Sequence, residues 1–223
     1  MKVSILDTGF ASAEKNMVMD QQLLRNMQPQ DTPLLHFYRW ETPAITYGYF
    51  INPQRHLILS DSWQVARRPT GGGIIVHSGD FSFSLLVPVK HKNYSSNTLA
   101  NYALVNSFIK RAIEKACGHS LTLLEKSPET NVNPHFCMAH PVPFDLMWQG
   151  KKIGGGAQRR TRNGFLHQGT ISLCSPSNLN HILPSEICEK MTIHSDSLLG
   201  SMERKKFEEG YASLKNALSA LNL

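Results

Sequence analysis

The sequence predicts an α/β fold in which helices flank a mixed sheet. Short runs rich in branched and aromatic residues, typical of strands, recur between residues 3 and 173. Amphipathic helical segments interrupt these runs and end the chain. Hairpins and helical connections alternate irregularly, so both parallel and antiparallel strand pairs are expected. A chain of 223 residues can bury a large core, and we expect one domain over residues 1–223.

The first half of the chain alternates strands with helices. A strand at 3–6 precedes a helix for which Ser12 is the expected N-cap and which Pro29 ends. Residues 97–117 are expected to form the clearest helix, because their apolar positions keep helical spacing and Gly118 follows as a C-cap. Further strands are expected at 34–39, 44–47, 62–67, 74–76 and 81–87.

The second half contains a polar loop, a hairpin and a terminal helix. Residues 125–137 are predicted to form a loop because they are polar and contain two prolines. Strands at 144–148 and 152–157 are expected to pair across a turn at Gln149 and Gly150, and 166–173 forms another strand. The apolar residues of 202–221 recur every three to four positions, which predicts a helix.

Composition favours a cytoplasmic protein with free thiols. The apolar run at the N-terminus is too short for a signal peptide, and no later stretch could span a bilayer. The four cysteines lack Cys-x-x-Cys spacing. The net charge of +6 suits an acidic partner, but charge alone does not choose between nucleic acid, a membrane surface and an acidic protein. Five cations share one segment: Lys151, Lys152, Arg159, Arg160 and Arg162.

Three segments carry residue types suited to chemistry. The glycines at 71–73 allow backbone amides to approach an anionic oxygen, and Arg67 and Arg68 precede them, although a bare glycine run is more often a flexible turn. Lys152 lies between a turn and a second glycine run, where an ammonium can bind a carbonyl or an anion. Its hairpin position predicts that the fold survives its replacement. Cys137 precedes this hairpin, and a nearby ammonium favours a nucleophilic thiolate, although a lone cysteine is more often simply packed.

Four motifs follow one another along most of the chain. They are the helical segment 13–20; Trp40-x-x-Pro43 with Gly48-Tyr49-Phe50; Arg67-Arg68-Pro69-Thr70-Gly71-Gly72-Gly73 with His77; and Lys152-Ile153-x-Gly155-x-Ala157-Gln158 with His167-x-Gly169-Thr170. In this order they resemble the catalytic domain shared by lipoate-protein ligases, octanoyltransferases and, more distantly, biotin-protein ligases. The resemblance implies a mixed sheet flanked by helices, related to biotin-protein ligases and class II aminoacyl-tRNA synthetases. The accessory domain of many ligases is not apparent.

The resemblance also implies one acyl or acyl-adenylate pocket. In it Lys152 would polarise the acyl carbonyl and stabilise developing charge. Asp145 matches an acidic hairpin position and is the expected magnesium ligand if ATP is used. The other expected pocket residues are Arg67, Arg68, Thr70, Gly71, Gly72, Gly73, His77, Gly155, Ala157, Arg159 and His167.

Two mechanisms fit the resemblance. A ligase uses ATP and magnesium to form a lipoyl-adenylate, whereas an octanoyltransferase takes the acyl chain from acyl-carrier protein onto a cysteine and then passes it to lysine. Cys137, placed just before Phe144-Asp145-Leu146, and Gln158 both resemble the cysteine-dependent transferases. Gly73 favours a ligase, because those transferases more often carry arginine at this position. These features together slightly favour the transferase mechanism, with Cys137 and Lys152 as catalytic residues.

Either mechanism implies an acceptor lysine on a lipoyl domain of a 2-oxoacid dehydrogenase or on the glycine cleavage H protein. Lipoate or octanoate is then a substrate, and we expect no tightly bound cofactor and no membrane partner. A nucleic-acid-binding module is the alternative from another class, suggested by the basic segment 151–162. The clustered glycines and the lack of a base-stacking motif argue against it.

Overall fold

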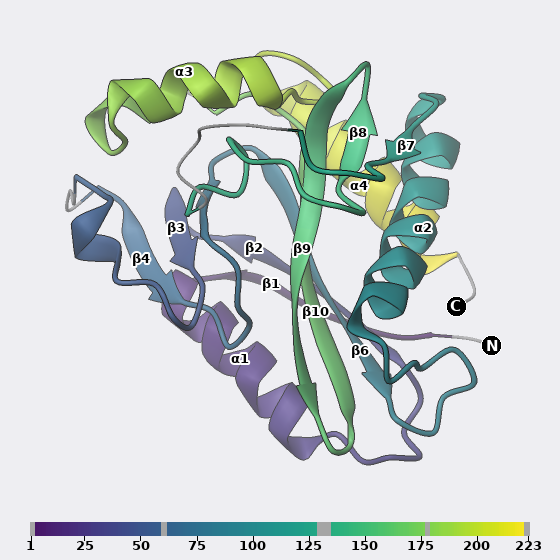
Figure 1. Ribbon diagram of the computed structural model, residues 1–223. Helices are drawn as coiled ribbons and strands as arrows, with labels where there is room; N and C mark the ends of the chain where they lie inside the picture. The colour runs from purple at the N-terminus through teal and green to yellow at the C-terminus, as the bar shows by residue number, and fades with distance from the viewer. Residues whose placement is uncertain (1–2, 59–61, 129–134, 177–178, 221–223) are drawn as a thin grey trace.

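The computed structural model describes residues 3–58, 62–128, 135–176 and 179–220. Within these ranges the chain forms a seven-stranded sheet, a three-stranded sheet and the helices that cover them (Figure 1). The strands are β1 (Ser4–Ala11), β2 (Leu34–Trp40), β3 (Ala44–Tyr47), β4 (Gln64–Arg67), β5 (Ile74–His77), β6 (Asp80–Pro88), β7 (Thr122–Leu123), β8 (Leu146–Trp148), β9 (Lys151–Thr161) and β10 (Gly164–Ser172). The α-helices are α1 (Ala13–Asn26), α2 (Thr98–Cys117), α3 (Ser185–His194) and α4 (Arg204–Ser219), with short 3-10 helices η1 (Pro53–Arg55) and η2 (Leu179–His181).

The larger sheet has the strand order β1-β2-β6-β10-β9-β8-β7. Its β1 and β2 are parallel and its other neighbours antiparallel, which confirms the predicted mixed sheet. The strands expected at 44–47, 62–67 and 74–76 do not join it, because β2 pairs directly with β6. Instead β3 lies between a parallel β4 and an antiparallel β5 in a separate small sheet.

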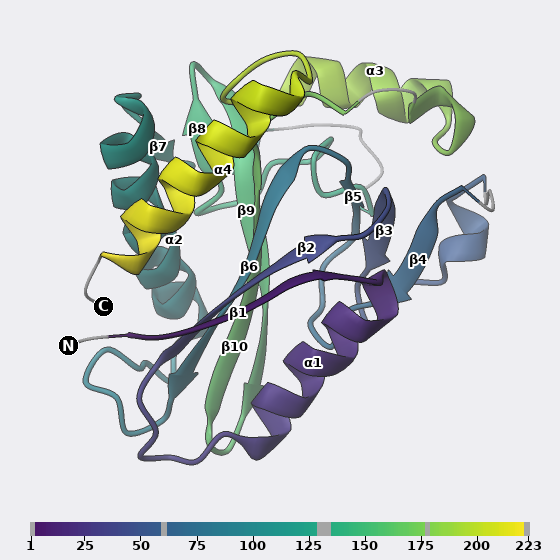
Figure 2. The same ribbon diagram turned by 180° about the vertical axis from the view of Figure 1, so that it is seen from behind.

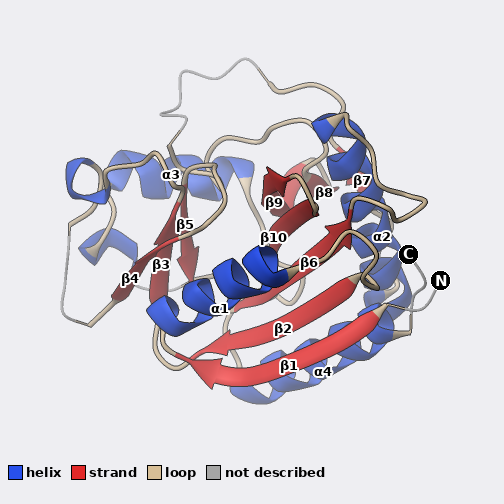
Figure 3. Cartoon of the chain, turned by 90° about the horizontal axis from the view of Figure 1, so that it is seen from below, coloured by secondary structure: helices blue, strands red, loops and turns tan. Residues whose placement is uncertain are grey.

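Alternating side chains bury both faces of the larger sheet. Phe81 and Phe83 of β6 pack in one cluster with Phe108 of α2 and Leu214 of α4. On the opposite face, Leu86 of β6 packs with Leu24 of α1 and Leu166 of β10. Helix α2 lies beside α4 in both views (Figures 1 and 2), and α1 lies across the sheet from α4 (Figure 3). The sheet is therefore covered on both sides.

Local sequence signals explain where the predicted helices begin and end. The Ser12 side chain accepts a hydrogen bond from the Lys15 amide at the start of α1, and Asn97 caps α2 in the same way. Gly118 ends α2 with a φ of 69°, as expected of a left-handed C-cap. The hairpin turn at Gln149 and Gly150 is also confirmed, with φ of 49° and 79°.

Several boundaries differ from the expectation. β1 extends to Ala11 rather than residue 6, and α3 is a helix that was not predicted as a separate element. The terminal helix α4 covers Arg204–Ser219, and residue 221 of the predicted helix lies outside the described residues. Residues 129–134 of the predicted loop also lie outside them. Among the described residues, no helix is both long and apolar enough to cross a membrane.

Two phenylalanines allow a matched test of this core. Phe108 is fully buried on α2, whereas Phe50 is 89% exposed. We expect Phe108→Ala to lower the free energy of unfolding by about 3–5 kcal/mol, because it removes buried apolar surface and leaves a cavity. Phe50→Ala should change it by less than about 0.5 kcal/mol. Urea denaturation measures both, and equal losses would contradict this description of the core.

Candidate active site

A cavity of about 320 Å³ lies where the glycine loop, residues 68–73, faces β9. Eight of the residues expected from the sequence line it, and they come from segments far apart in the chain. These are Arg68, Gly72, Gly73, Cys137, Asp145, Lys152, Gly155 and Ala157. The structure therefore brings the glycine loop, the cysteine and the lysine together around one space.

Arg68 holds the glycine loop in shape from inside the protein. Its buried guanidinium donates hydrogen bonds to the carbonyls of Gly71 at 3.1 Å and Gly73 at 2.7 Å, and to Thr46 Oγ1 at 2.8 Å. Burial lowers the pKa of Arg68, and interaction with Cys137 opposes this shift. An arginine keeps its proton in proteins, so a fixed positive charge lies beside the cavity.

Cys137 lies against the glycine loop with its sulfur hydrogen-bonded. The backbone N–H of Gly73 donates to Cys137 Sγ at 3.2 Å, and the Cys137 amide donates to the Ile74 carbonyl at 3.1 Å. A donor aimed at sulfur stabilises negative charge there. A Cβ at position 73 would collide with the His135 carbonyl. This crowding is a local reason for Gly73 that applies whatever the reaction mechanism.

Lys152 and Asp145 form a buried ion pair at the other side of the cavity. The Lys152 Nζ lies 2.6 Å from Asp145 Oδ2 and donates to the Cys137 carbonyl at 2.8 Å. Burial raises the pKa of Asp145, while Lys152 opposes that shift. Gly155 makes room for the pair, because a Cβ there would meet Asp145 Oδ1.

The burial of Lys152 corrects one expectation from the sequence. The residue is only 3% exposed, so its hairpin position does not make it a surface residue. Its replacement by alanine would leave the Asp145 carboxylate buried without its cation, which is strongly destabilising. The sequence did not indicate this burial, because a lysine between a turn and a run of glycines lies in no apolar pattern that would mark it as a core position.

The other expected pocket residues lie outside the cavity lining. Arg67 and Arg159 place their guanidinium groups 4.7 and 5.4 Å from the ring centre of Tyr49. His77 is buried, stacks on Trp40 and contacts Asp80 Oδ2 at 2.8 Å. These three side chains support neighbouring segments rather than the cavity wall.

Thr70 anchors the glycine loop to a buried polar chain. Its hydroxyl donates to Gln168 Oε1 at 2.7 Å, and the Gln168 amide donates to Asp20 Oδ2 at 2.6 Å. Asp20 Oδ1 contacts His36 Nδ1 at 2.8 Å. Gly71, also expected in the pocket, contributes its carbonyl to the hydrogen bond with Arg68 and does not line the cavity. Sequence reasoning missed Asp20 and Gln168, although both lie within motifs used for the resemblance.

Sequence reasoning also missed part of the cavity wall. Tyr102 and Leu99 of α2 and Met138 after the cysteine line the cavity. Tyr102 also accepts a hydrogen bond from the Gln158 amide at 2.9 Å, which ties α2 to β9. The only available signal was the amphipathic pattern of α2, which does not distinguish cavity residues from core residues.

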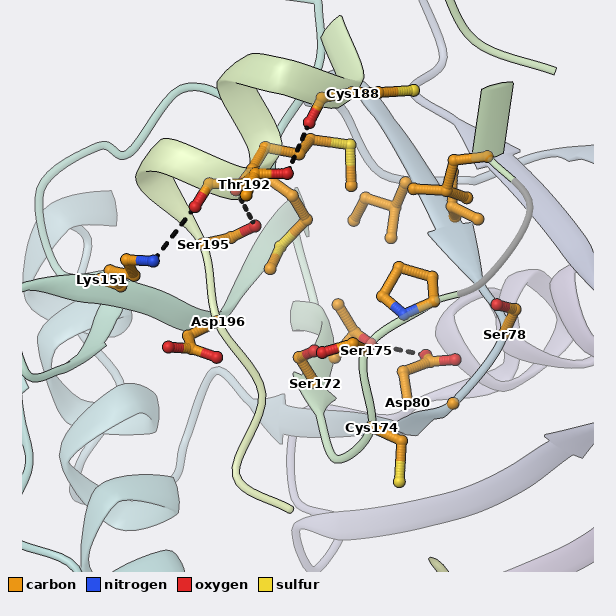
Figure 4. A pocket seen from close by; sticks show the side chains of 18 of the residues that line it. Ser78, Asp80, Lys151, Ser172, Cys174, Ser175, Cys188, Thr192, Ser195 and Asp196 are labelled. Atoms are coloured by element: carbon orange, nitrogen blue, oxygen red, sulfur yellow. Dashed lines mark hydrogen bonds between the residues drawn. The ribbon is translucent and has the colours of Figure 1, made fainter. Parts of the chain in front are cut away.

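A second cavity of about 450 Å³ adjoins the first beneath α3 (Figure 4). The two cavities share Ile75, Met138 and Thr170 in their linings. Lys151 is the one cation among the described lining residues, and its Nζ donates to the Thr192 carbonyl at 3.1 Å. Asp80 and Asp196 also line this space. Its charges are therefore poorly suited to a polyphosphate.

The carboxylate of Asp145, the magnesium ligand expected if ATP is used, is engaged by other groups of the protein. Asp145 is held by Lys152 and also accepts a hydrogen bond from the Val142 amide at 2.7 Å. Within the described ranges no group of three or more histidine, cysteine, aspartate or glutamate side chains is placed to hold a metal ion. Magnesium usually needs carboxylate oxygens that are free to coordinate it.

The sequence matches a known domain family over most of its length. The model of the lipoyl protein ligase A/B catalytic domain matches residues 12–216. The octanoyltransferase LipM of Oceanobacillus iheyensis is 30% identical over 182 residues, which are 77% of this chain and 64% of that protein. The chain therefore spans slightly less than two thirds of this relative's length.

Solved structures show the same fold. A bi-partite lipoate protein ligase from Thermoplasma acidophilum, described with its E2 lipoyl domain, gives a TM-score of 0.66 at 19% identity and covers 98% of this chain and 83% of that one. Lipoate-protein ligase A bound with ATP gives 0.58 at 18% identity, with 99% and 100% covered. At such identities the likeness concerns the fold.

The burial of His167 should make the free energy of unfolding depend on pH. The ring is buried under Gly156, and burial lowers its pKa to about 3, from an ordinary value of 6.5. The unfolded chain binds this proton below pH 6.5 and the folded protein does not until about pH 3. Stability should therefore fall between these values as pH decreases, by about 1.4 kcal/mol per unit. His167→Gln should remove this part of the slope in urea denaturation at pH 7, 5 and 4. An unchanged slope would contradict it.

Proposed function

The chain belongs to the family of the lipoyl protein ligase A/B catalytic domain, and we propose that it transfers an octanoyl group to a lysine of a lipoyl-carrier domain through a thioester on Cys137. One observation carries this proposal. The Cys137 sulfur accepts a hydrogen bond from the Gly73 amide within a cavity that also holds the Lys152 ammonium. A nucleophile, a stabiliser of its charge and a cation thus meet in one space.

The first step forms the acyl-enzyme. The Cys137 thiolate attacks the carbonyl carbon of octanoyl-acyl-carrier protein, and negative charge develops on the carbonyl oxygen. Lys152 has three N–H donors, of which Asp145 and the Cys137 carbonyl occupy two. We assign the third to the oxyanion. The carbon–sulfur bond to the donor then breaks, and the released thiol carries the proton that Cys137 gave up.

The second step passes the acyl group to the acceptor. A neutral lysine amine attacks the Cys137 thioester, the new amide bond forms, and the bond to Cys137 Sγ breaks. The proton lost by the amine returns to the cysteine, so the enzyme ends as it began. Lys152 serves the same carbonyl oxygen in both steps, because that carbon remains attached to Cys137 between them.

ATP-dependent lipoate ligation is the second candidate. The second cavity supports it, because the space adjoins the Lys152 site and is large enough for a further ligand. Against it, Lys151 is the one cation in the described lining of that cavity, two aspartates share the lining, and Asp145 is paired with Lys152. The charges of the site therefore favour thioester transfer.

The basic segment gives no support to nucleic-acid binding. Lys152 is buried in an ion pair, and Lys151 and Arg159 each donate to a backbone carbonyl. The exposed cations of the segment are Arg159, Arg160 and Arg162, and no base-stacking motif accompanies them.

The proposal includes substrates and partners. The acyl substrate is an octanoyl group, and acyl-carrier protein is its donor, whereas free lipoate or octanoate would be the substrate of a ligase. The acceptor is a lipoyl domain of a 2-oxoacid dehydrogenase or the glycine cleavage H protein. ATP and magnesium belong only to the ligase alternative. The four cysteines are free, as in a reducing compartment, which supports a cytoplasmic location.

Cys137→Ser tests the covalent step. Incubation with octanoyl-acyl-carrier protein should add one octanoyl group to the wild type, visible by intact-protein mass spectrometry and removable with hydroxylamine. The variant should form no such adduct and transfer nothing to a lipoyl domain, because an unactivated hydroxyl is a poor nucleophile. Cys188→Ser, which changes another partly exposed thiol, should behave as wild type. Octanoyl transfer by the Cys137 variant would contradict the mechanism, and ATP-dependent lipoylation without any adduct would favour the ligase.

Lys152→Met tests the oxyanion role. We expect the transfer rate to fall roughly 100- to 1,000-fold with loss of the charged donor. The variant should also lose about 3–5 kcal/mol of stability, because Asp145 becomes an unpaired buried carboxylate. Adding Asp145→Asn should restore much of the stability while activity stays low, as urea denaturation and the octanoyl-transfer assay would show. Near-normal transfer by the stabilised double variant would refute the role of Lys152.

A further inference from the structure

A tight turn beside the glycine loop displays an aromatic side chain to solvent. Residues 48–51, here called the Tyr49 turn, are closed by a hydrogen bond from the Ile51 amide to the Gly48 carbonyl at 3.0 Å. Phe50 lies in this turn and is 89% exposed, and its ring contacts Tyr49 edge-on at 5.2 Å between centroids. A single exposed phenylalanine is ordinary in proteins, so Phe50 is informative only together with the charged and apolar side chains around it.

The Tyr49 turn is rigidly joined to the catalytic loop. The Gly48 amide donates to the Gly73 carbonyl at 3.1 Å, and the Tyr49 amide donates to the Thr70 carbonyl at 3.0 Å. The two backbones touch so closely that a Cβ at Gly48 would collide with the Gly72 carbonyl. Since Gly72 and Gly73 line the cavity, Phe50 is held at a fixed place near its rim.

Positive charge surrounds this turn. Arg67 and Arg159 are both exposed and lie on the Tyr49 ring, and Arg159 is also fixed by donating to the Pro69 carbonyl at 3.0 Å. Leu99, 59% exposed, lines the cavity from α2. Tyr49, Phe50, Arg67 and Arg159 thus form a surface that combines aromatic side chains with two ordered cations, and Leu99 adds an apolar side chain at the cavity. Aromatic and arginine side chains of this kind dominate binding at protein interfaces.

We propose that this surface docks the acceptor, a carrier domain with an acidic face beside its target lysine. The inference rests on the proposed transfer to a carrier-domain lysine. The two arginines would bind carboxylates on the partner. A lysine reaches only the length of its own side chain, so the body of the acceptor must rest against the rim of the cavity. The donor delivers its thioester on a much longer pantetheine arm and can remain farther away.

Equilibrium binding of an unmodified lipoyl domain from a 2-oxoacid dehydrogenase tests the docking independently of catalysis. Phe50→Asp should weaken binding roughly tenfold or more, because it removes the anchor and repels an acidic partner. Phe50→Ala should weaken it less, and Phe50→Lys less than Phe50→Asp. Ile193→Asp makes the same change at an exposed apolar residue of α3 and should bind as wild type. The affinity should fall as salt increases.

Several results would overturn the proposal. They are wild-type affinity for Phe50→Asp, an equal loss for Phe50→Lys and Phe50→Asp, or a loss of acyl-carrier protein binding with the lipoyl domain unaffected. Octanoylation of Cys137 is measured in the same variants and should be unchanged. Absence of that adduct in the wild type would refute the thioester mechanism alone, whereas a normal adduct with unaltered lipoyl-domain binding would refute the docking surface alone.

Discussion

The buried guanidinium of Arg68 is the contact on which the rest of the site depends. It ties two carbonyls of the glycine loop to Thr46 in the small sheet, and so fixes the peptide groups on either side of the one that joins Gly72 to Gly73. The peptide group between those two carries the Gly73 N–H, which donates to Cys137 Sγ. The hydrogen bond to sulfur therefore follows from backbone geometry, and a preformed donor needs no rearrangement during reaction.

The opposite wall of the cavity depends on a missing side chain. Lys152 and Asp145 meet beside Gly155, where a Cβ atom would collide with Asp145 Oδ1. The Asp145 carboxylate replaces the water that would otherwise solvate the Lys152 ammonium. The backbone carbonyl of Cys137 accepts a second hydrogen bond from this ammonium and so helps to fix its position. Nucleophile and cation are consequently placed by the same short segment of chain.

Much of the fold followed from local signals, whereas the division into two sheets did not. Ser12, Asn97 and Gly118 act within their own turns, so the sequence carries their effect directly. The pairing of β2 with β6 depends on contacts between residues more than forty positions apart, which local periodicity does not encode. The same distinction holds in the site. Lys152 and Cys137 were found by motif, but the burial of Lys152 and the contribution of Tyr102 arise only from tertiary packing.

The polar chain beneath the glycine loop constrains how this protein can change. Hydrogen bonds join the side chains of Thr70, Gln168, Asp20 and His36 one to the next. The chain ends at Thr8, whose Oγ1 lies 2.9 Å from His36 Nε2. Exchange of any inner member would leave a buried partner unsatisfied. We therefore expect these positions to change only together. Substitution in the glycine loop is thus constrained by α1 and β2, neither of which contributes to the cavity lining.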